Sequence, residues 1–190
     1  MGMSFDAHTD ETDEALLQRF ADGDQSAARA LTLRLTPRVL AVAYRMLGER
    51  AEAEDVAQEA MMRLWKIAPD WRVGEAQVTT WLHRVASNLC IDRLRKRRRD
   101  GPPLEDVAEP QDPTPAPVTV MMAADRATAV RAALDALPDR QKQAVTLRHF
   151  QDLSNPQIAE IMEISVEAVE SLQSRGRRAL ATAMQGRKDV

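Results

Sequence analysis

A proline-rich segment in the middle of the chain sets the first limit on how this protein can fold. Residues 101–120 read GPPLEDVAEPQDPTPAPVTV, with six prolines, four acidic residues and no basic residue. Proline removes a backbone donor and fixes φ, and a segment with so few apolar side chains cannot bury enough of them to fold. We therefore predict a flexible linker over 101–122 that separates a domain at 13–100 from a smaller domain at 123–186.

Apolar residues on both sides of this linker recur at helical spacing, which predicts an all-α protein made of two small helical domains. In the first half, the pattern predicts a helix from near Asp13, a second capped by Asp24, a third that begins at Pro37, and a fourth over 50–67. Residues 1–12 are polar and acidic, and we expect them to be disordered.

Composition excludes several classes of protein. Cys90 is the only cysteine, which rules out an internal disulfide framework. No apolar run approaches the roughly 18 residues of a membrane span, and the acidic N-terminus lacks the parts of a signal peptide. The sequence also has no Gly-rich phosphate loop, nucleophile motif or paired acid motif. We expect a soluble, cytoplasmic protein that is not an enzyme, needs no cofactor and does not insert into a membrane.

Residues 79–99, TTWLHRVASNLCIDRLRKRRR, join an apolar helical stripe to a dense cationic end. The whole chain has a net charge of −3, whereas residues 81–100 contain seven cations and two anions. The charges continue an amphipathic pattern, which places them on a docked helix, although such a run can also be a merely solvated face. A rigid cationic helix near aromatic residues suits a nucleic-acid backbone with exposed bases. Asn88 is expected to divide the segment into two helices joined at a bend.

The predicted helix over 50–67 has two different faces. One is apolar and should be buried. The other is a stripe of mixed side chains: Asp55, Gln58, Glu59, Met62 and Lys66. Such a stripe is either a solvated face or a surface offered to a partner's coiled coil.

The chain ends in two helices joined by a tight turn. Residues 154–157, Ser-Asn-Pro-Gln, read as a capping box for the first helix. Ser165 caps a longer second helix that is basic toward its end. The spacing, the small Ala159 at the expected crossing and the polar outer face of the second helix indicate a helix-turn-helix.

Taken together, these segments resemble the extracytoplasmic-function (ECF), RpoE-like group of the sigma-70 family of bacterial sigma factors, over 15–184. Three motifs carry the resemblance: EAEDVAQEAMMRLW at 52–65, the segment 79–99, and the stretch from LDALPDRQ to GRRAL at 134–180. It implies a sigma-2-like helical bundle and a sigma-4-like helix-turn-helix domain. It further implies an alternative sigma factor that directs core RNA polymerase to promoter DNA in a stress response. A cognate anti-sigma factor would hold it inactive, and any zinc in that complex would come mainly from the partner.

The resemblance also assigns three sets of site residues. The stripe Asp55, Gln58, Glu59, Met62 and Lys66 would bind core polymerase. The minus-ten element would be contacted by Trp71, Thr79, Thr80, Asn88, Arg93, Arg95, Lys96, Arg97 and Arg98. The minus-thirty-five element would be contacted by Ser171, Ser174, Arg175, Arg177 and Arg178. Asn88, Thr79 and Thr80 have an alternative role as helix caps.

The helix-turn-helix departs from the family pattern at three acidic residues. Glu170 stands where a basic residue is common, Glu163 replaces a frequent glycine, and Glu167 adds a second anion near the helix start. An acid can accept from cytosine N4 but repels phosphate, so the upstream sequence preference stays open. These acids slightly favour an alternative function, a sigma mimic that titrates an anti-sigma factor without binding promoters. The cationic segment disfavours it.

A metal site is not expected in this chain. His83 and Cys90 are seven residues apart, so one helical face could present both to an ion. Two ligands are too few for a structural zinc site.

Overall fold

The computed structural model describes residues 11–72, 74, 76–100 and 128–185. These residues form helices and no strands, which confirms the all-α fold of two helical domains. The first domain contains α1 (Asp13–Ala21), α2 (Gln25–Leu47), α3 (Arg50–Ile67), the 3-10 turn η1 (Ala68–Asp70) and α4 (Val78–Asp100). The second contains a helix over 128–135, α6 (Asp139–Phe150), α7 (Asn155–Met162) and α8 (Val166–Gln185). The predicted linker lies outside the described residues.

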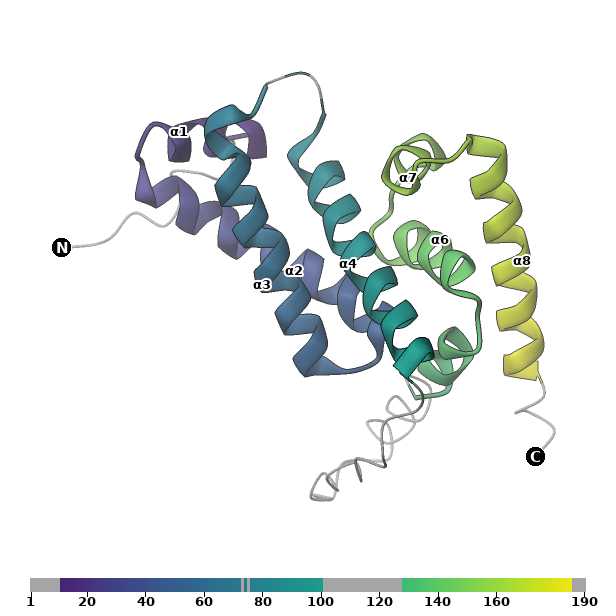
Figure 1. The fold of residues 1–190 in the computed structure, drawn as a ribbon. Coiled ribbons are helices and arrows are strands. Elements are labelled where there is room, and N and C mark those ends of the chain that lie inside the picture. Colours follow the sequence, from purple (N-terminus) through teal and green to yellow (C-terminus); the bar gives the residue numbers. More distant parts are fainter. Residues whose placement is uncertain (1–10, 73, 75, 101–127, 186–190) are drawn as a thin grey trace, which may run out of the picture.

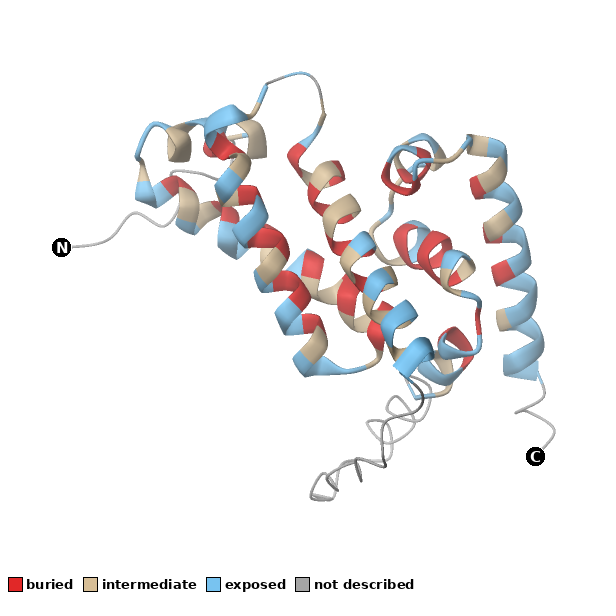
Figure 2. Cartoon of the chain, viewed as in Figure 1, coloured by how far each residue is buried: buried red, intermediate tan, exposed pale blue. Residues whose placement is uncertain are grey.

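The first domain is built around α2, which packs along α1, α3 and α4 (Figure 1). Apolar residues at helical spacing face inward from all four helices, and Figure 2 shows the buried positions gathered on the facing sides. Leu16, Leu31, Leu64 and Leu82 are among the side chains with almost no exposed surface. None of the described helices is both long enough and apolar enough to cross a bilayer.

The prediction that a separate helix begins at Pro37 was wrong, because α2 runs through this residue. Pro37 cannot donate to the carbonyl of Leu33, a defect that costs about 3 kcal/mol or more inside a helix. Leu33 is 61% exposed, so its carbonyl lies on a side of the helix that water can reach. Leu35 and Val39, on either side of the proline, are both buried in the same core. Their burial on one continuous face outweighs the local defect.

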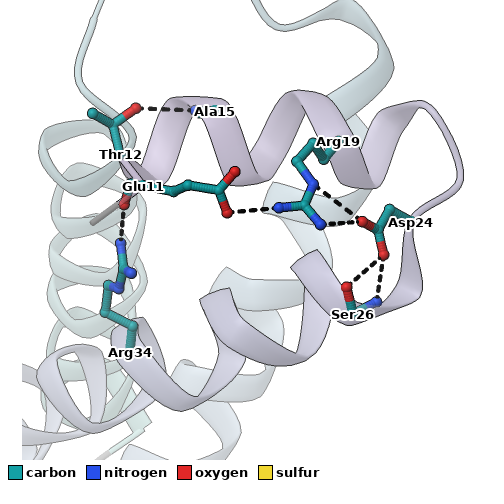
Figure 3. Close-up of polar contacts among 7 residues, drawn as sticks. All are labelled: Glu11, Thr12, Ala15, Arg19, Asp24, Ser26 and Arg34. Atoms are coloured by element: carbon teal, nitrogen blue, oxygen red, sulfur yellow. Dashed lines mark hydrogen bonds and ion pairs between the residues drawn. The ribbon is translucent and has the colours of Figure 1, made fainter. Parts of the chain in front are cut away.

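The prediction of disorder was wrong for its last two residues, Glu11 and Thr12. Residues 1–10 lie outside the described part of the chain, but Glu11 and Thr12 are part of the fold. The Thr12 hydroxyl accepts from the Ala15 N–H and caps α1 (Figure 3). Arg19 bridges Glu11 and Asp24, so it connects the start of α1 to the start of α2. Hydrogen bonds from Ser26 and Arg19 hold the pKa of the Asp24 carboxyl below its usual range, which keeps this cap ionised.

The predicted bend at Asn88 was also wrong, because α4 is one helix from Val78 to Asp100. Asn88 is exposed, and Asn in a helix costs only about 0.7 kcal/mol relative to Ala. Ala86 and Cys90 on either side of it are fully buried against the domain core. Packing against the domain core therefore keeps α4 continuous at Asn88, where the local sequence would allow the helix to end.

The second domain contains the predicted helix-turn-helix. The Ser154 N–H donates to Oε1 of Gln157 at 2.9 Å, as expected for the capping box, and α7 follows. The Ser165 hydroxyl accepts from the Ala168 N–H and begins α8. α8 packs across α6 at Gly176, which is buried.

The turn between α7 and α8 carries backbone strain at Glu163, whose φ is +54°. A left-handed conformation costs about 1–2 kcal/mol for a residue with a Cβ, and glycine avoids most of this cost. We therefore expect Glu163→Gly to raise the free energy of unfolding of the second domain by about 1 kcal/mol in chemical denaturation. Glu163→Ala is the control, because it removes the same charge but keeps the Cβ. An equal gain from Glu163→Ala would show that charge, not backbone strain, is the cause.

Candidate nucleic-acid interface and docking surface

The cationic end of α4 divides into arginines that bond to α2 and α3 and exposed cations that do not. Arg93 Nη1 donates to the Glu52 carbonyl at 2.9 Å. Arg97 Nη1 donates to the Leu47 carbonyl at 3.0 Å, and its Nη2 lies 2.5 Å from the Glu52 carboxylate. Both arginines thus fasten α4 to α3 and the end of α2. Their first role is structural, although both belong to the predicted minus-ten set.

Arg95, Lys96 and Arg98 point away from the core of the first domain. The side chains of Arg95 and Arg98 are 69% and 64% exposed, and Lys96 is also exposed. Arg95, Arg98 and Asn88 line a hollow of about 570 Å³ between α4 and the second domain. The structure therefore brings together one amide and two guanidinium groups from the predicted minus-ten set.

The second domain covers this face of α4. Arg98 forms an ion pair with Asp139 at the start of α6, and Arg84 lies 3.3 Å from the Glu163 carboxylate. On α2, the Arg45 guanidinium sits 4.0 Å above the ring of Phe150. Any nucleic acid that reached the hollow would have to replace the ion pair of Arg98.

Of the remaining predicted minus-ten residues, Thr79 and Thr80 lie at the opposite end of α4 and Trp71 precedes that helix. Thr79 and Arg98 are 19 positions apart, which is roughly 28 Å along a helix axis. Trp71 is partly buried and makes an edge-to-face contact with Trp81, with ring centroids 5.9 Å apart. Thr80 is only 4% exposed, so it is a packing residue in this arrangement. The set is thus an extended track along one helix and not a compact pocket.

The outward stripe of α3 lies beside an apolar groove. Met62 is 59% exposed, and Gln58 lies near it in the lining of the groove. Leu40 from α2 and Trp65 from α3 contribute further apolar surface. Asp55, Glu59 and Lys66 complete the stripe; Glu59 pairs with Arg63 at 2.9 Å and Asp55 lies 3.7 Å from Arg93. The sequence analysis predicted the α3 side of this surface but not the α2 side, which Thr32, Thr36 and Leu40 line.

The outer face of α8 presents all five predicted upstream-contact residues to solvent: Ser171, Ser174, Arg175, Arg177 and Arg178. Next to them is a polar hollow that Arg148, from the end of α6, and Asn155, the first residue of α7, help to line. Neither of these two residues was predicted. Their positions at a helix end and a helix start beside α8 were the available signal.

Two titratable side chains of α4, His83 and Cys90, are buried. His83 is 4% exposed, and burial lowers its pKa to about 4, so it is neutral. Burial raises the pKa of the Cys90 thiol to about 12, so it is an inert packing group. Among the residues that the structure describes, no three His, Cys, Asp or Glu side chains gather closely enough to bind a metal ion.

Comparison with known proteins identifies the family. The Sigma-70 region 2 family matches residues 31–100, and the Sigma-70, region 4 family matches residues 127–180. The ECF RNA polymerase sigma factor SigW of Bacillus subtilis is 30% identical, over 86% of this chain and 92% of its own length. The chain is an ECF sigma factor of the sigma-70 family. The RNA polymerase sigma-H factor of Pseudomonas aeruginosa is 31% identical over 93% of this chain and 96% of its own.

Solved structures agree with this fold. CnrH, in complex with the cytosolic domain of CnrY, superposes with a TM-score of 0.69 at 24% identity, over 93% of this chain and 99% of that one. The sigma factor RpoE from Bartonella quintana, in complex with the anti-sigma factor NepR, gives 0.66 at 23% identity, over 83% and 96%. In this sigma factor, region 2 includes both the apolar groove and the cationic end of α4, and region 4 includes the helix-turn-helix.

Proposed function

We propose that this sigma factor binds core RNA polymerase through the stripe and groove on α3 and directs the enzyme to promoters that region 2 and region 4 recognise. One observation carries the proposal: a single helical domain places an exposed apolar groove and a separate cationic helix on the same rigid frame. The groove supplies affinity for a partner helix, and the cations supply affinity for a phosphate backbone. Polymerase supplies the chemistry, so the chain itself needs no catalytic group.

Promoter opening would use the exposed side of α4. Arg95, Lys96 and Arg98 would neutralise phosphates of the non-template strand, and Asn88 would hydrogen-bond to an unstacked base in the hollow beside them. Removing one base from the stack costs a few kcal/mol, and it costs least where the duplex is already strained. Thr79, about 28 Å from Arg98 along α4, and Trp71, which precedes α4, would contact the same strand. Region 4 would contact the minus-thirty-five element through Ser171, Ser174, Arg175, Arg177 and Arg178 on α8.

We also propose that an anti-sigma factor controls this chain in the cytoplasm. Met62 is a large apolar side chain left 59% exposed in the lining of the apolar groove, which suits an amphipathic helix laid against the first domain. A partner bound there would exclude polymerase from the same surface. The sigma-mimic alternative is less favoured, because a decoy has no use for exposed cations on α4.

The docking proposal is tested by Met62→Glu, which places a charge at the edge of the groove without loss of helix preference. We expect the affinity for core polymerase to fall about tenfold, or roughly 1.4 kcal/mol, in a fluorescence binding titration. Arg50→Ala is the matched control on α3, because its side chain is 81% exposed and outside the groove. Unchanged binding by Met62→Glu would mean that the docking surface lies elsewhere. Failure of the unaltered chain to bind core enzyme would refute the function and leave the mimic.

A further inference from the structure

Three acidic residues distinguish the helix-turn-helix, and the structure gives two of them a local role. Glu163 lies 3.3 Å from Arg84 of α4. Glu167 sits in the first turn of α8, where its own N–H and the Ser165 hydroxyl lower the pKa of its carboxyl. This geometry makes Glu167 part of the cap of α8, where a negative charge is favourable. Neither acid lines the polar hollow beside α8.

Glu170 differs from both, because it lines the polar hollow and is contacted by the side-chain amide of Asn155. Asn155 Nδ2 lies 3.4 Å from Glu170 Oε1, and Asn155 Oδ1 accepts from Gln173 Nε2 at 3.0 Å. Gln173 is 6% exposed, so this chain of amides is anchored in the domain. At 3.4 Å this contact is longer than an ordinary N–H···O hydrogen bond, so the Glu170 carboxylate can still accept a shorter bond from a ligand.

The surroundings of Glu170 indicate what that ligand is. The hollow measures about 420 Å³, and its lining combines this carboxylate with the cations Arg148 and Arg177 and with Ser174. Two cations at the sides suit phosphates, whereas an ionised carboxylate can only accept hydrogen bonds. In the DNA major groove the donors are the exocyclic amines of cytosine and adenine. Adenine also presents the N7 acceptor, which would repel a carboxylate, so cytosine fits better.

We propose that Glu170, positioned by Asn155, selects a cytosine in the minus-thirty-five element. The inference rests on the proposed function, because it requires α8 to enter the groove of promoter DNA. Glu170 is then a specificity-determining residue and not simply a weakened phosphate contact. Asn155 acts through Glu170 and is a positioning residue.

The experiment is a selection from a randomised duplex DNA library by the holoenzyme, formed from the full chain and core polymerase. We expect the unaltered chain to enrich an upstream motif with cytosine at one position. Glu170→Gln should move that single position toward adenine, because glutamine pairs with adenine N6 and N7, with a change in preference of roughly 5-fold to 100-fold. Asn155→Ala should relax the same position only. Glu160→Gln is the matched control, since this exposed acid on α7 lies outside the hollow.

The outcomes separate the two proposals. If Glu170→Gln enriches the same motif as the unaltered chain, the inference is overturned and the proposed function stands. A uniform rise in affinity at every sequence would also overturn it, because that result would mark Glu170 as a repulsive charge only. If the unaltered holoenzyme enriches no upstream motif, the proposed function fails and this inference fails with it.

Discussion

Replacement of Arg95, Lys96 and Arg98 by alanine should lower the rate of promoter opening on the order of 100-fold or more, because three charge-assisted phosphate contacts are lost together. All three side chains are exposed, so each domain should stay folded, although the ion pairs of Arg95 with Asp92 and of Arg98 with Asp139 are lost. The dependence of opening on salt should also weaken, with the log–log slope falling by about 2 to 3, since fewer counterions are released. Opening is measured with a fluorescent base in the minus-ten region, and the fold by thermal unfolding.

Arg97→Ala is the matched control, because it removes one charge from the same helix but breaks contacts within the protein. Arg97 contacts the Leu47 carbonyl and the Glu52 carboxylate, and its side chain is 35% exposed. We expect a loss of about 1–2 kcal/mol in the free energy of unfolding, after allowance for solvent screening. Normal opening by the triple variant would refute the phosphate role of α4. Wild-type stability in Arg97→Ala would refute the division of the cations into two groups.

The ion pair between Arg98 and Asp139 has to break before Arg98 can bind DNA. Because the second domain covers the hollow, the chain without polymerase should bind duplex DNA weakly. Core polymerase would have to hold the domains apart before Arg98 could reach a phosphate. The long linker segment predicted between the domains makes that separation inexpensive, because loop entropy changes slowly with length.

Helix caps were predictable from the sequence, whereas the effect of packing against distant helices was not. Asp24, Ser154 and Ser165 were predicted as caps because a cap depends on neighbours two or three residues away. Pro37 and Asn88 were predicted as breaks for the same local reason, yet both lie within continuous helices. Their surroundings are set by helices far away in the sequence, and burial on a shared face decided the outcome.

The candidate sites show the same contrast between features set by local sequence and features set by distant contacts. The stripe on α3 was predictable, because the 3.6-residue period decides which side chains share a face. The groove beside it was not, because Leu40 comes from another helix. The sequence could not tell Arg97 from Arg98, although the first binds Glu52 of the same domain and the second pairs with Asp139 of the other. Which partner a cation meets depends on contacts more than 40 residues away in the chain.

Gly176→Leu should unfold the second domain or leave it marginally stable. A Cβ at Gly176 would lie 2.7 Å from Cγ2 of Val145 and 3.5 Å from the Gln141 carbonyl, at the crossing of α6 and α8. Val145 is only 2% exposed, so it is packed inside the domain. Overpacking costs about 1–3 kcal/mol for small additions, and leucine adds far more volume than one methyl group. We expect a loss of about 3 kcal/mol or more, which is at least half the stability of a domain this small.

The smaller substitution Gly176→Ala tests whether the close approach to Val145 is the cause. Alanine gains about 1 kcal/mol of helix preference over glycine, but the contact with Val145 should outweigh this gain and leave a net loss of about 1 kcal/mol. In a Val145→Ala background the Cγ2 atom is gone, so the same Gly176→Ala change should become stabilising by up to about 1 kcal/mol. The sign change is read from a double-mutant cycle in chemical denaturation. A loss that persists without the Val145 side chain would mean that the Gln141 backbone, and not the valine, requires glycine at this crossing.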